Sequence, residues 1–424
     1  MRLQRPLSAI TKGSVAAMFV LSLSLAACGG TGSSSGGVIK IATDLPVSGT
    51  DASVGLPTQY GADLAISQNQ DLGGGYTLQV VHKNDEGTTG ADPTIGAANI
   101  RALLADPQVM AVVGPFNSGV AVAEIPVANT GGLVLISPAN TNPGLTKEQY
   151  AAARGINFAQ LHPAGSKEYY FRVPATDDVQ GKVDAQIAAG DPINAKTAFV
   201  VDDSTTYGAG LADFFKTNFT SGGGTVAGSH SITPQEVSSL NSLAATIIAA
   251  KPDVVFYGGV TSQGGGALKR ALVAGGYTGP LVGGDGIADD PSWITTAGAN
   301  ASANTYGTVA APDPASLTSG DAAKFKTDYA AFAQGKSDSD LLPYSAAAYA
   351  CATIEIAAIK AVIKSGKAPT RAAVRDYIAG NTFPTIIGNI SFDQNGDNAG
   401  DKVFSIYAIN PGASTWVFSK EVTA

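Results

Sequence analysis

The chain has 424 residues, which corresponds to roughly two or three domains of ordinary size and is long enough to bury a substantial core. Charged residues make up 14% and hydrophobic residues 44%, a composition that excludes disorder over most of the length. The 26 Lys and Arg against 34 Asp and Glu give a formal net charge of −8, and no stretch concentrates basic residues. This charge pattern argues against a nucleic-acid partner.

Residues 1–27 have the pattern of an export signal. Three basic residues precede an uncharged apolar run over 13–27, which is too short to span a bilayer comfortably. The run ends in Leu-Ala-Ala-Cys-Gly, which resembles the bacterial lipobox. The resemblance implies that Cys28 becomes a lipidated N-terminus, anchored to the bilayer through a diacylglycerol. A plain secretory signal is the alternative.

Residues 28–37 contain only Gly, Ser and Thr after the cysteine and predict a flexible tether. Beyond it, short apolar runs alternate with longer helical patterns in two successive series. The first series predicts strands over 38–42, 78–82, 109–113 and 134–136, and helices over 58–70, 92–104 and 120–129. The second predicts helices over 181–189, 208–219, 240–250 and 265–274, and strands over 197–201, 225–231, 254–257 and 280–282. Continuous apolar strands that alternate with helices predict an α/β fold with two doubly wound parallel sheets.

The remaining chain is less regular. It predicts helices over 322–333, 344–365 and 371–379, and strands over 388–392 and 403–409. Residues 393–401 resemble half of a calcium-binding loop but lack its glycine at the sixth place and its glutamate at the twelfth. A β-hairpin turn between the last two strands is the better interpretation.

Signatures of catalysis are absent from the sequence. Its three histidines, His82, His162 and His230, are far apart, and no zinc-protease, C-x-x-C or phosphate-loop motif occurs. The one G-x-S-x-G match lies in the tether, where no strand or helix supports it. We therefore expect no enzymatic activity, no metal and no cofactor. Cys351 lies in an alanine-rich helical pattern and is expected to be a buried core residue.

Polar residues gather after the predicted strands. They form the segments 114–119, 136–143, 202–208, 257–261 and 283–286. The carboxyl ends of parallel strands and the helix N-termini that follow them form the ligand crevice of an open sheet. Each segment alone could instead supply only turn and helix-capping residues.

The order of these segments resembles one known family. Gly-Pro-Phe-Asn-Ser (114–118), Ser-Pro-Ala-Asn-Thr-Asn-Pro (137–143), Tyr-Phe-Arg-Val-Pro-Ala-Thr-Asp-Asp-Val-Gln-Gly (170–181), Asp-Asp-Ser-Thr-Thr-Tyr-Gly-Ala-Gly (202–210), Tyr-Gly-Gly and Gly-Gly-Asp-Gly follow one another along the chain. This series is similar to the branched-chain amino-acid binding proteins, the leucine/isoleucine/valine-type solute receptors of ABC importers with the type I periplasmic-binding fold. The similarity extends from about residue 38 to the C-terminus.

The resemblance implies two lobes joined by three hinge crossings and closing on a ligand. The N-terminal lobe would comprise residues 38–175 and 311–400, and the C-terminal lobe residues 176–310 and 401–424.

Specific residues inherit roles from this resemblance. Ser118 matches a serine that holds the ligand carboxylate, and Thr141 a threonine that contacts both carboxylate and ammonium. Ala139 matches a residue whose carbonyl accepts from the ammonium, and Tyr207 a tyrosine that closes over the ligand. Asp285 stands where the family often has a glutamate that binds the ammonium. A carboxylate at a helix N-terminus and an ammonium at an acidic side chain are consistent pairings.

Two further positions bear on the ligand. Asp177 falls near a hinge crossing, where it would contact ligand or only cap the following helix. Val260 replaces the family's second-lobe aromatic residue. The segment 147–169 is longer than in compact members, and the first-lobe disulfide of well-studied members is absent.

These observations predict a monomeric, extracytoplasmic, lipid-anchored receptor without catalytic residues. It would bind a small amino acid, branched-chain or aliphatic, by hinge closure and deliver it to ABC permease subunits. Alternatives on the same fold are an amide or urea-like compound, a nucleobase or an aromatic acid as ligand, or a sensory role. A hydrolase is a third class, but no histidine stands near a nucleophile in these loops.

Overall fold

The computed structural model describes residues 36–288, 290–413 and 415–424. The export signal, Cys28 and most of the tether lie outside the described residues, so the lipid anchor remains a prediction.

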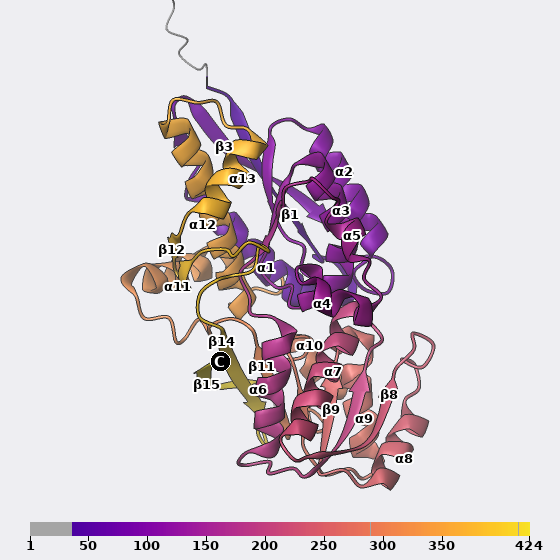
Figure 1. Ribbon diagram of the computed structural model, residues 1–424. Coiled ribbons are helices and arrows are strands. Elements are labelled where there is room, and N and C mark those ends of the chain that lie inside the picture. Colours follow the sequence, from indigo (N-terminus) through magenta and orange to yellow (C-terminus); the bar gives the residue numbers. More distant parts are fainter. Residues whose placement is uncertain (1–35, 289, 414) are drawn as a thin grey trace, which may run out of the picture. The chain divides into compact units, whose positions relative to one another are not determined.

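The first sheet has six strands in the order β2-β3-β1-β4-β5-β6. Two of them, β1 and β3, lie in the upper part of Figure 1. They are β1 (Val38–Leu45), β2 (Asp71–Gly73), β3 (Tyr76–Asn84), β4 (Val109–Val113), β5 (Val134–Ser137) and β6 (Tyr170–Arg172). β2 pairs antiparallel with β3, and the other pairs are parallel. Every residue of β4 is buried, as expected for a strand covered on both faces.

Helices cover both faces of this sheet. One face packs against α1 (Ala52–Ser67), α12 (Pro343–Lys364) and α13 (Arg371–Gly380), and α11 (Gly320–Ala333) packs on α1. The other face packs against α2 (Pro93–Ala105), α3 (Ser118–Gly131) and α5 (Phe158–Leu161). Short elements complete the lobe: α4 (Glu148–Ala151) and the two-stranded pair β12 (Phe383–Thr385) and β13 (Gly388–Ile390).

The helix α12 is long and apolar enough to cross a membrane by length and composition alone. In the fold it is a core helix, because 67% of its most apolar window is buried and it packs along α1. Cys351 lies on this helix, free and fully buried, which confirms its predicted place in the core.

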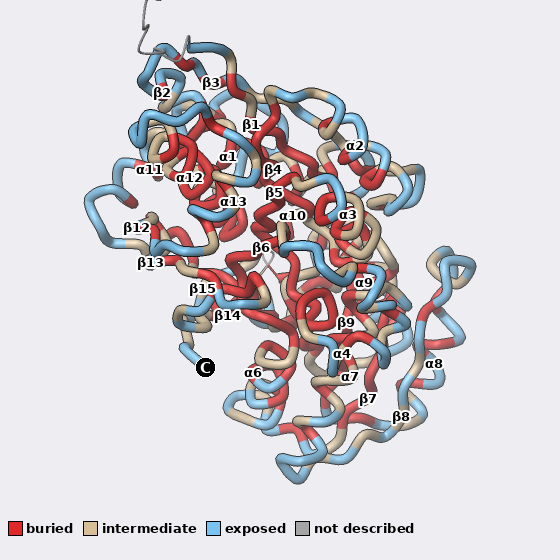
Figure 2. The backbone as a smooth tube through the Cα atoms, turned by 45° about the horizontal axis from the view of Figure 1, so that its top comes forward, coloured by how far each residue is buried: buried red, intermediate tan, exposed pale blue. Residues whose placement is uncertain are grey.

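The second sheet has seven strands in the order β15-β14-β11-β10-β9-β7-β8. They are β7 (Thr197–Asp202), β8 (Thr225–Ser231), β9 (Val254–Gly258), β10 (Leu281–Gly283), β11 (Thr305–Val309), β14 (Val403–Ile409) and β15 (Val417–Thr423). One face packs against α6 (Asp177–Ala189) and α7 (Thr206–Ser221), and the other against α8 (Asn241–Ala250), α9 (Gly265–Ala274) and α10 (Pro291–Ala297). The central strands of both sheets are buried along their length (Figure 2).

The chain passes between the two sheets three times: from β6 to α6, from β11 to α11 and from β13 to β14. The predicted α/β class, with two doubly wound lobes and three crossings, is confirmed. The predicted turn within residues 393–401 forms and is closed by an antiparallel bridge between Phe392 and Asn398, but its flanking strands do not make a hairpin, because β13 pairs with β12 whereas β14 joins the second sheet. The turn belongs instead to the third crossing, where Asp397 forms a buried ion pair with Arg172.

Candidate functional site

A cavity of about 330 Å³ opens between the carboxyl ends of the two sheets. Its walls include the start of α3, the loop after β5, the start of α7 and the loops after β9 and β10. Of the predicted ligand-binding residues, Ser118, Ala139, Thr141, Tyr207, Val260 and Asp285 line it. Because the parallel strands of each sheet end at the same edge, the topology brings together side chains that lie far apart in the sequence.

The first-lobe wall is built around the N-terminus of α3. Ser118 is its first residue and is 2% exposed, and its Oγ accepts a 3.4 Å hydrogen bond from the N–H of Asn142. The N–H groups of the first helical turn have no partner inside the helix. The N–H groups of Val120 and Ala121 bond back to Asn117, which leaves those of Ser118 and Gly119 for an anion at this wall.

Hydrogen bonds to the loop after β4 and to β6 fix the position of the loop that carries Ala139 and Thr141. Ser137 Oγ donates to the carbonyl of Pro115 (2.6 Å) and accepts from the N–H of Asn140 (2.8 Å). The amide of Asn140 donates to the carbonyl of Phe116 (2.6 Å) and accepts from the Tyr170 hydroxyl (2.9 Å). The loop after β5 and the loop after β4 are thus locked together, which fixes the positions of Thr141 and Ser118.

Asp285 of the second lobe is the most strongly held polar group at the cavity. Its Oδ1 accepts from the Tyr207 hydroxyl (2.8 Å) and from Gln180 Nε2 (2.8 Å), and its Oδ2 accepts from the Tyr344 hydroxyl (2.7 Å). Burial raises the pKa of Asp285, and these three donors oppose the rise. The pKa values of Tyr207 and Tyr344 are raised well above normal by burial and by the Asp285 charge, so both hydroxyls remain protonated donors.

Asp177 does not line the cavity. It is the first residue of α6, at the first crossing, and its N–H donates to the carbonyl of Thr141 (2.8 Å). Its carboxylate is fully buried without a hydrogen-bond partner, and burial followed by the Asp285 charge raises its pKa well above normal. The structure therefore places Asp177 behind the ligand wall and not in it.

Two residues that sequence reasoning missed also belong to this region. Asp51 ends a short helix η1 (Gly49–Asp51), lines the cavity and accepts a 2.6 Å hydrogen bond from Ser262 Oγ of the second lobe. The polar loop after β1 was the available signal for it. Tyr344 starts the core helix α12 and reaches Asp285 from the first lobe. No local pattern marks Tyr344, because tertiary packing alone brings it there.

The cavity is acidic and contains no cationic side chain. Among the described residues that line it, Asp51 and Asp285 are charged, and none is His, Lys, Arg or Cys. A nucleophilic Ser118 would therefore lack a neighbouring base, which disfavours hydrolytic chemistry. A ligand with a carboxylate and an ammonium would find the α3 N-terminus for the first group and Asp285 for the second.

The two lobes are closed on one another around this cavity. Hydrogen bonds cross between them from Ser53 Oγ to Asp290 (3.0 Å), from Asn142 Nδ2 to the carbonyl of Thr206 (2.7 Å) and from Gln263 Nε2 to the carbonyl of Thr89 (2.6 Å). The cross-lobe contacts at Asp51 and Asp285 add to them. This set of polar contacts is typical of the closed state of a hinged protein.

This chain is similar to known proteins in both sequence and fold. The Leu/Ile/Val-binding protein BraC3 of Rhizobium johnstonii is 29% identical over 378 residues, which cover 88% of this chain and 92% of that protein. The crystal structure of a leucine binding protein from Thermotoga maritima matches with a TM-score of 0.75 at 23% identity, covering 91% of this chain and 98% of that one.

A solute binding protein from R. palustris, solved in complex with 4-hydroxybenzoate, matches with a TM-score of 0.72 at 16% identity, covering 91% of this chain and 96% of that one. The family profile of the periplasmic binding proteins matches residues 38–413. The predicted resemblance is confirmed: the chain belongs to the periplasmic binding protein family.

Proposed function

We propose that the protein is an extracytoplasmic receptor that binds an amino acid with an aliphatic side chain between its lobes and hands it to an ABC permease. One observation carries the proposal: the cavity sets the open N-terminus of α3 in one lobe against the Asp285 carboxylate in the other, with no cationic side chain between them. This arrangement suits a zwitterion. The Leu/Ile/Val-binding relative and the leucine binding protein support an aliphatic amino acid.

In this proposal the ligand carboxylate accepts from the N–H groups and hydroxyl at Ser118 and from the Thr141 hydroxyl, while the carbonyl of Ala139 accepts from the ammonium. Asp285 has three donors already and, as a carboxylate with about four acceptor sites, can take one more from the ammonium. Tyr207 and Val260 lie on the second-lobe wall against the ligand. Contacts from both lobes then favour the closed state.

Delivery and anchoring complete the proposal. Closure would present a surface made of both lobes to the permease, and the diacylglycerol on Cys28 would hold the monomeric receptor at the membrane. These two steps rest on the family and on the export signal.

Titration calorimetry with each proteinogenic amino acid tests the proposal on the chain that begins after Cys28. We expect one aliphatic group to bind, Ser118→Ala and Asp285→Asn each to weaken binding at least tenfold, and Asp253→Asn to leave it unchanged. Asp253 is the matched control because it caps the opposite end of the second sheet, where it accepts from the N–H groups of Lys196 and Thr197. Undiminished affinity in both site variants would contradict the assignment of this cavity.

An aromatic acid is the second candidate ligand. A cavity of about 330 Å³ leaves room beyond an aliphatic side chain, and Val260 leaves the second-lobe wall without the family's aromatic ring. The R. palustris protein shows that this fold accepts 4-hydroxybenzoate. Binding of 4-hydroxybenzoate without detectable binding of any proteinogenic amino acid would select this candidate.

A further inference from the structure

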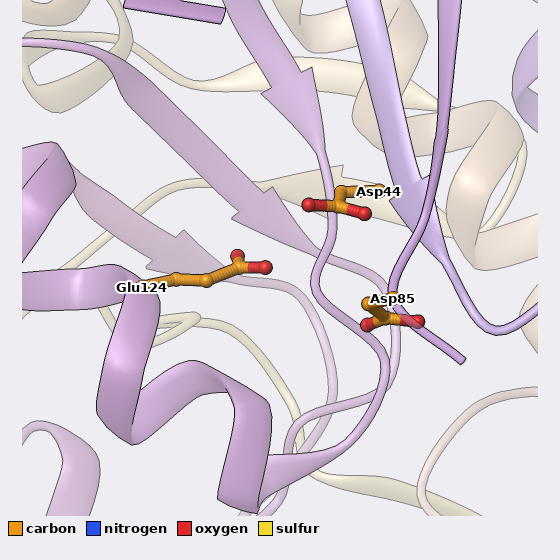
Figure 3. A group of neighbouring side chains, drawn as sticks. All are labelled: Asp44, Asp85 and Glu124. Carbon is orange, nitrogen blue, oxygen red and sulfur yellow. The ribbon is translucent and has the colours of Figure 1, made fainter. Parts of the chain in front are cut away.

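Three carboxylates meet inside the first lobe, away from the ligand cavity. Asp44 lies near the end of β1, Asp85 directly follows β3, and Glu124 lies on α3 (Figure 3). One oxygen from each lies within 4.8 Å of the others, and all three residues are buried, with 0% exposure for each. We call these three residues the carboxylate cluster.

The strand pairing accounts for two of its members. β1 and β3 are neighbouring parallel strands, and their register sets Leu45 opposite Asn84, so Asp44 and Asp85 emerge at the same edge of the sheet. Glu124 does not follow from this pairing. It comes from the helix above, is wholly buried, and points at the two aspartates, and no donor from outside the cluster, among the described residues, reaches either of its oxygens.

The hydrogen bonding of the cluster is incomplete. Asn99 Nδ2 donates to Asp44 Oδ1 (2.9 Å), and Asp44 and Glu124 can share a proton between their carboxylates. Among the described residues, no donor from outside the cluster reaches Asp44 Oδ2 or the side-chain oxygens of Asp85 and Glu124. A buried carboxylate without a partner is strongly unfavourable, and three together also repel one another. Burial and the neighbouring charges accordingly raise the pKa values of Asp85 and Glu124 well above normal. Protons, a bound cation or both must therefore offset the negative charge of this cluster, to which Lys83 adds a positive charge near Asp44.

The surrounding backbone leaves room for the glutamate to reach the aspartates. A Cβ at Gly96 of α2 would lie 2.6 Å from Glu124 Oε1 and 2.5 Å from a methyl group of Val120. A side chain at residue 96 would force Val120 or Glu124 to move, so Gly96 helps α3 to bring this carboxylate close to α2.

We propose that the carboxylate cluster is a structural cation site for Ca²⁺. Calcium takes oxygen ligands at about 2.3–2.6 Å, so ligands on opposite sides of one ion lie about 5 Å apart, which matches three oxygens within 4.8 Å of one another. A single proton joins only two carboxylates, whereas one Ca²⁺ can contact all three and offset two of their three negative charges. Bound there, the ion ties the ends of β1 and β3 to α3, whose N-terminus carries Ser118. This site departs from the sequence-based prediction of no metal.

Metal content and thermal unfolding in the absence of any amino acid test the site. The chain purified without chelator should hold about one calcium per molecule. After removal with EDTA, saturating calcium should raise the melting temperature by about 2–4 °C, and magnesium should do less because it keeps its own water ligands.

Matched variants locate the ion. Glu124→Gln keeps the shape and should lower calcium affinity at least ~100-fold, and Asp85→Asn should do the same. Glu355→Gln is the control, since Glu355 is another fully buried glutamate with both oxygens unpartnered, on α12 and outside the cluster. It should keep the calcium response of the unmodified chain.

Two results would overturn the proposal. No bound calcium and no thermal response in the unmodified chain would leave protons as the compensating charge. An equal response in Glu124→Gln would place the ion elsewhere. Because neither readout involves an amino acid, failure of the calcium site leaves the proposed receptor function standing, and failure of the receptor function leaves the calcium site standing.

Discussion

The hydroxyl of Tyr344, on the first-lobe helix α12, donates a 2.7 Å hydrogen bond to Oδ2 of Asp285 in the second lobe. The same carboxylate accepts from Tyr207 within its own lobe. Asp285 thus faces the cavity and also joins the lobes, so in the proposed function closure and ligand binding share one charged group.

Tyr344→Phe removes this cross-lobe bond and keeps the ring. A hydrogen bond to a charged group contributes about 1.5–3 kcal/mol, so we expect the ratio of closed to open forms to fall roughly ten- to a hundredfold and the ligand to bind more weakly by a similar factor. Small-angle scattering without ligand and calorimetry with ligand measure the two effects.

Tyr349→Phe is the control for this change. Tyr349 lies on the same helix and also donates a 2.8 Å hydrogen bond, but to Gln68 within the first lobe. It should change neither closure nor affinity. A Tyr344→Phe variant that behaves like Tyr349→Phe would show that the cross-lobe bond does not contribute to closure.

Arg172 and Asp397 form a buried ion pair at the hinge: Arg172 ends β6, just before the first crossing, and Asp397 lies in the third crossing. Arg172 is 0% exposed, and its guanidinium donates to Asp397 Oδ1 (2.7 Å), to the carbonyl of Asn142 (2.6 Å) and to Thr146 Oγ1 (2.6 Å). Asp397→Asn leaves the buried cation uncompensated, so we expect a loss of about 3–5 kcal/mol in the free energy of unfolding, measured in urea at pH 7.

An exposed ion pair provides the comparison for Asp397. Lys324 and Asp328 pair along α11, with Lys324 69% exposed, and Lys324→Ala should leave the free energy of unfolding almost unchanged. Arg172 also donates to the carbonyl of Asn142, the residue that follows Thr141 in the loop after β5. If Asp397→Asn proves as mild as Lys324→Ala, water or another group must compensate Arg172 in solution.

The parallel sheets were predictable because strands covered on both faces are continuous apolar runs, as in β4 and β9. Most of the ligand wall was predictable for a related reason: in this topology the residue after a strand lies at the crevice, whatever its distance along the chain. The segments that carry Ser118 and Asp285 follow from that rule, whereas the resemblance to the family singled out these two residues within them.

The missed features depend on packing between distant segments. Tyr344 begins a helix whose pattern marks only its apolar face, and Asp44, Asp85 and Glu124 each stand alone in the sequence. The turn near Asp397 was misassigned because local residue preferences describe a turn without saying which strands flank it. The short elements between 147 and 161 lack a full helical period, so no periodic pattern reveals them.

Lys269 gives a prediction for the pH dependence of stability. It lies on α9 at 1% exposure, its Nζ donates to the carbonyl of Asn304 (3.2 Å), and burial lowers its pKa to about 8. Since the unfolded chain binds this proton up to a pKa near 10.4, the charged lysine penalises the fold below pH 8, and the penalty disappears as the pH rises from 8 to 10.4.

Lys269→Met removes the charge and fills the same space. We expect it to raise the free energy of unfolding at pH 7 by about 3 kcal/mol, and the difference from the unmodified chain to shrink toward zero by about pH 10.5. Urea unfolding of both proteins at several pH values measures this. A pH-independent difference would show that Lys269 stays charged in the fold.

The long segment 147–169, which follows β5, supplies a second link between the lobes. Its Arg154 forms an ion pair with Asp213 on α7 of the second lobe, and its guanidinium lies 5.4 Å from the ring centre of Phe214. Tyr150 meets the same ring edge-on at 5.4 Å. The segment therefore contributes to holding the lobes together at a place separate from the ligand.

Arg154→Ala should open the hinge without unfolding either lobe. Asp213 is 43% exposed, which limits the ion pair to about 0.5–1 kcal/mol, and the contact with the ring adds a similar amount. We therefore expect ligand affinity to fall roughly five- to thirtyfold, mainly through faster dissociation, with little change in melting temperature. Arg375→Ala is the control, because Arg375 pairs with Asp376 and lies 6.0 Å from the ring centre of Tyr169 entirely within the first lobe. Stopped-flow release of the bound ligand distinguishes the two variants, and equal release rates would mean that the segment after β5 plays no part in closure.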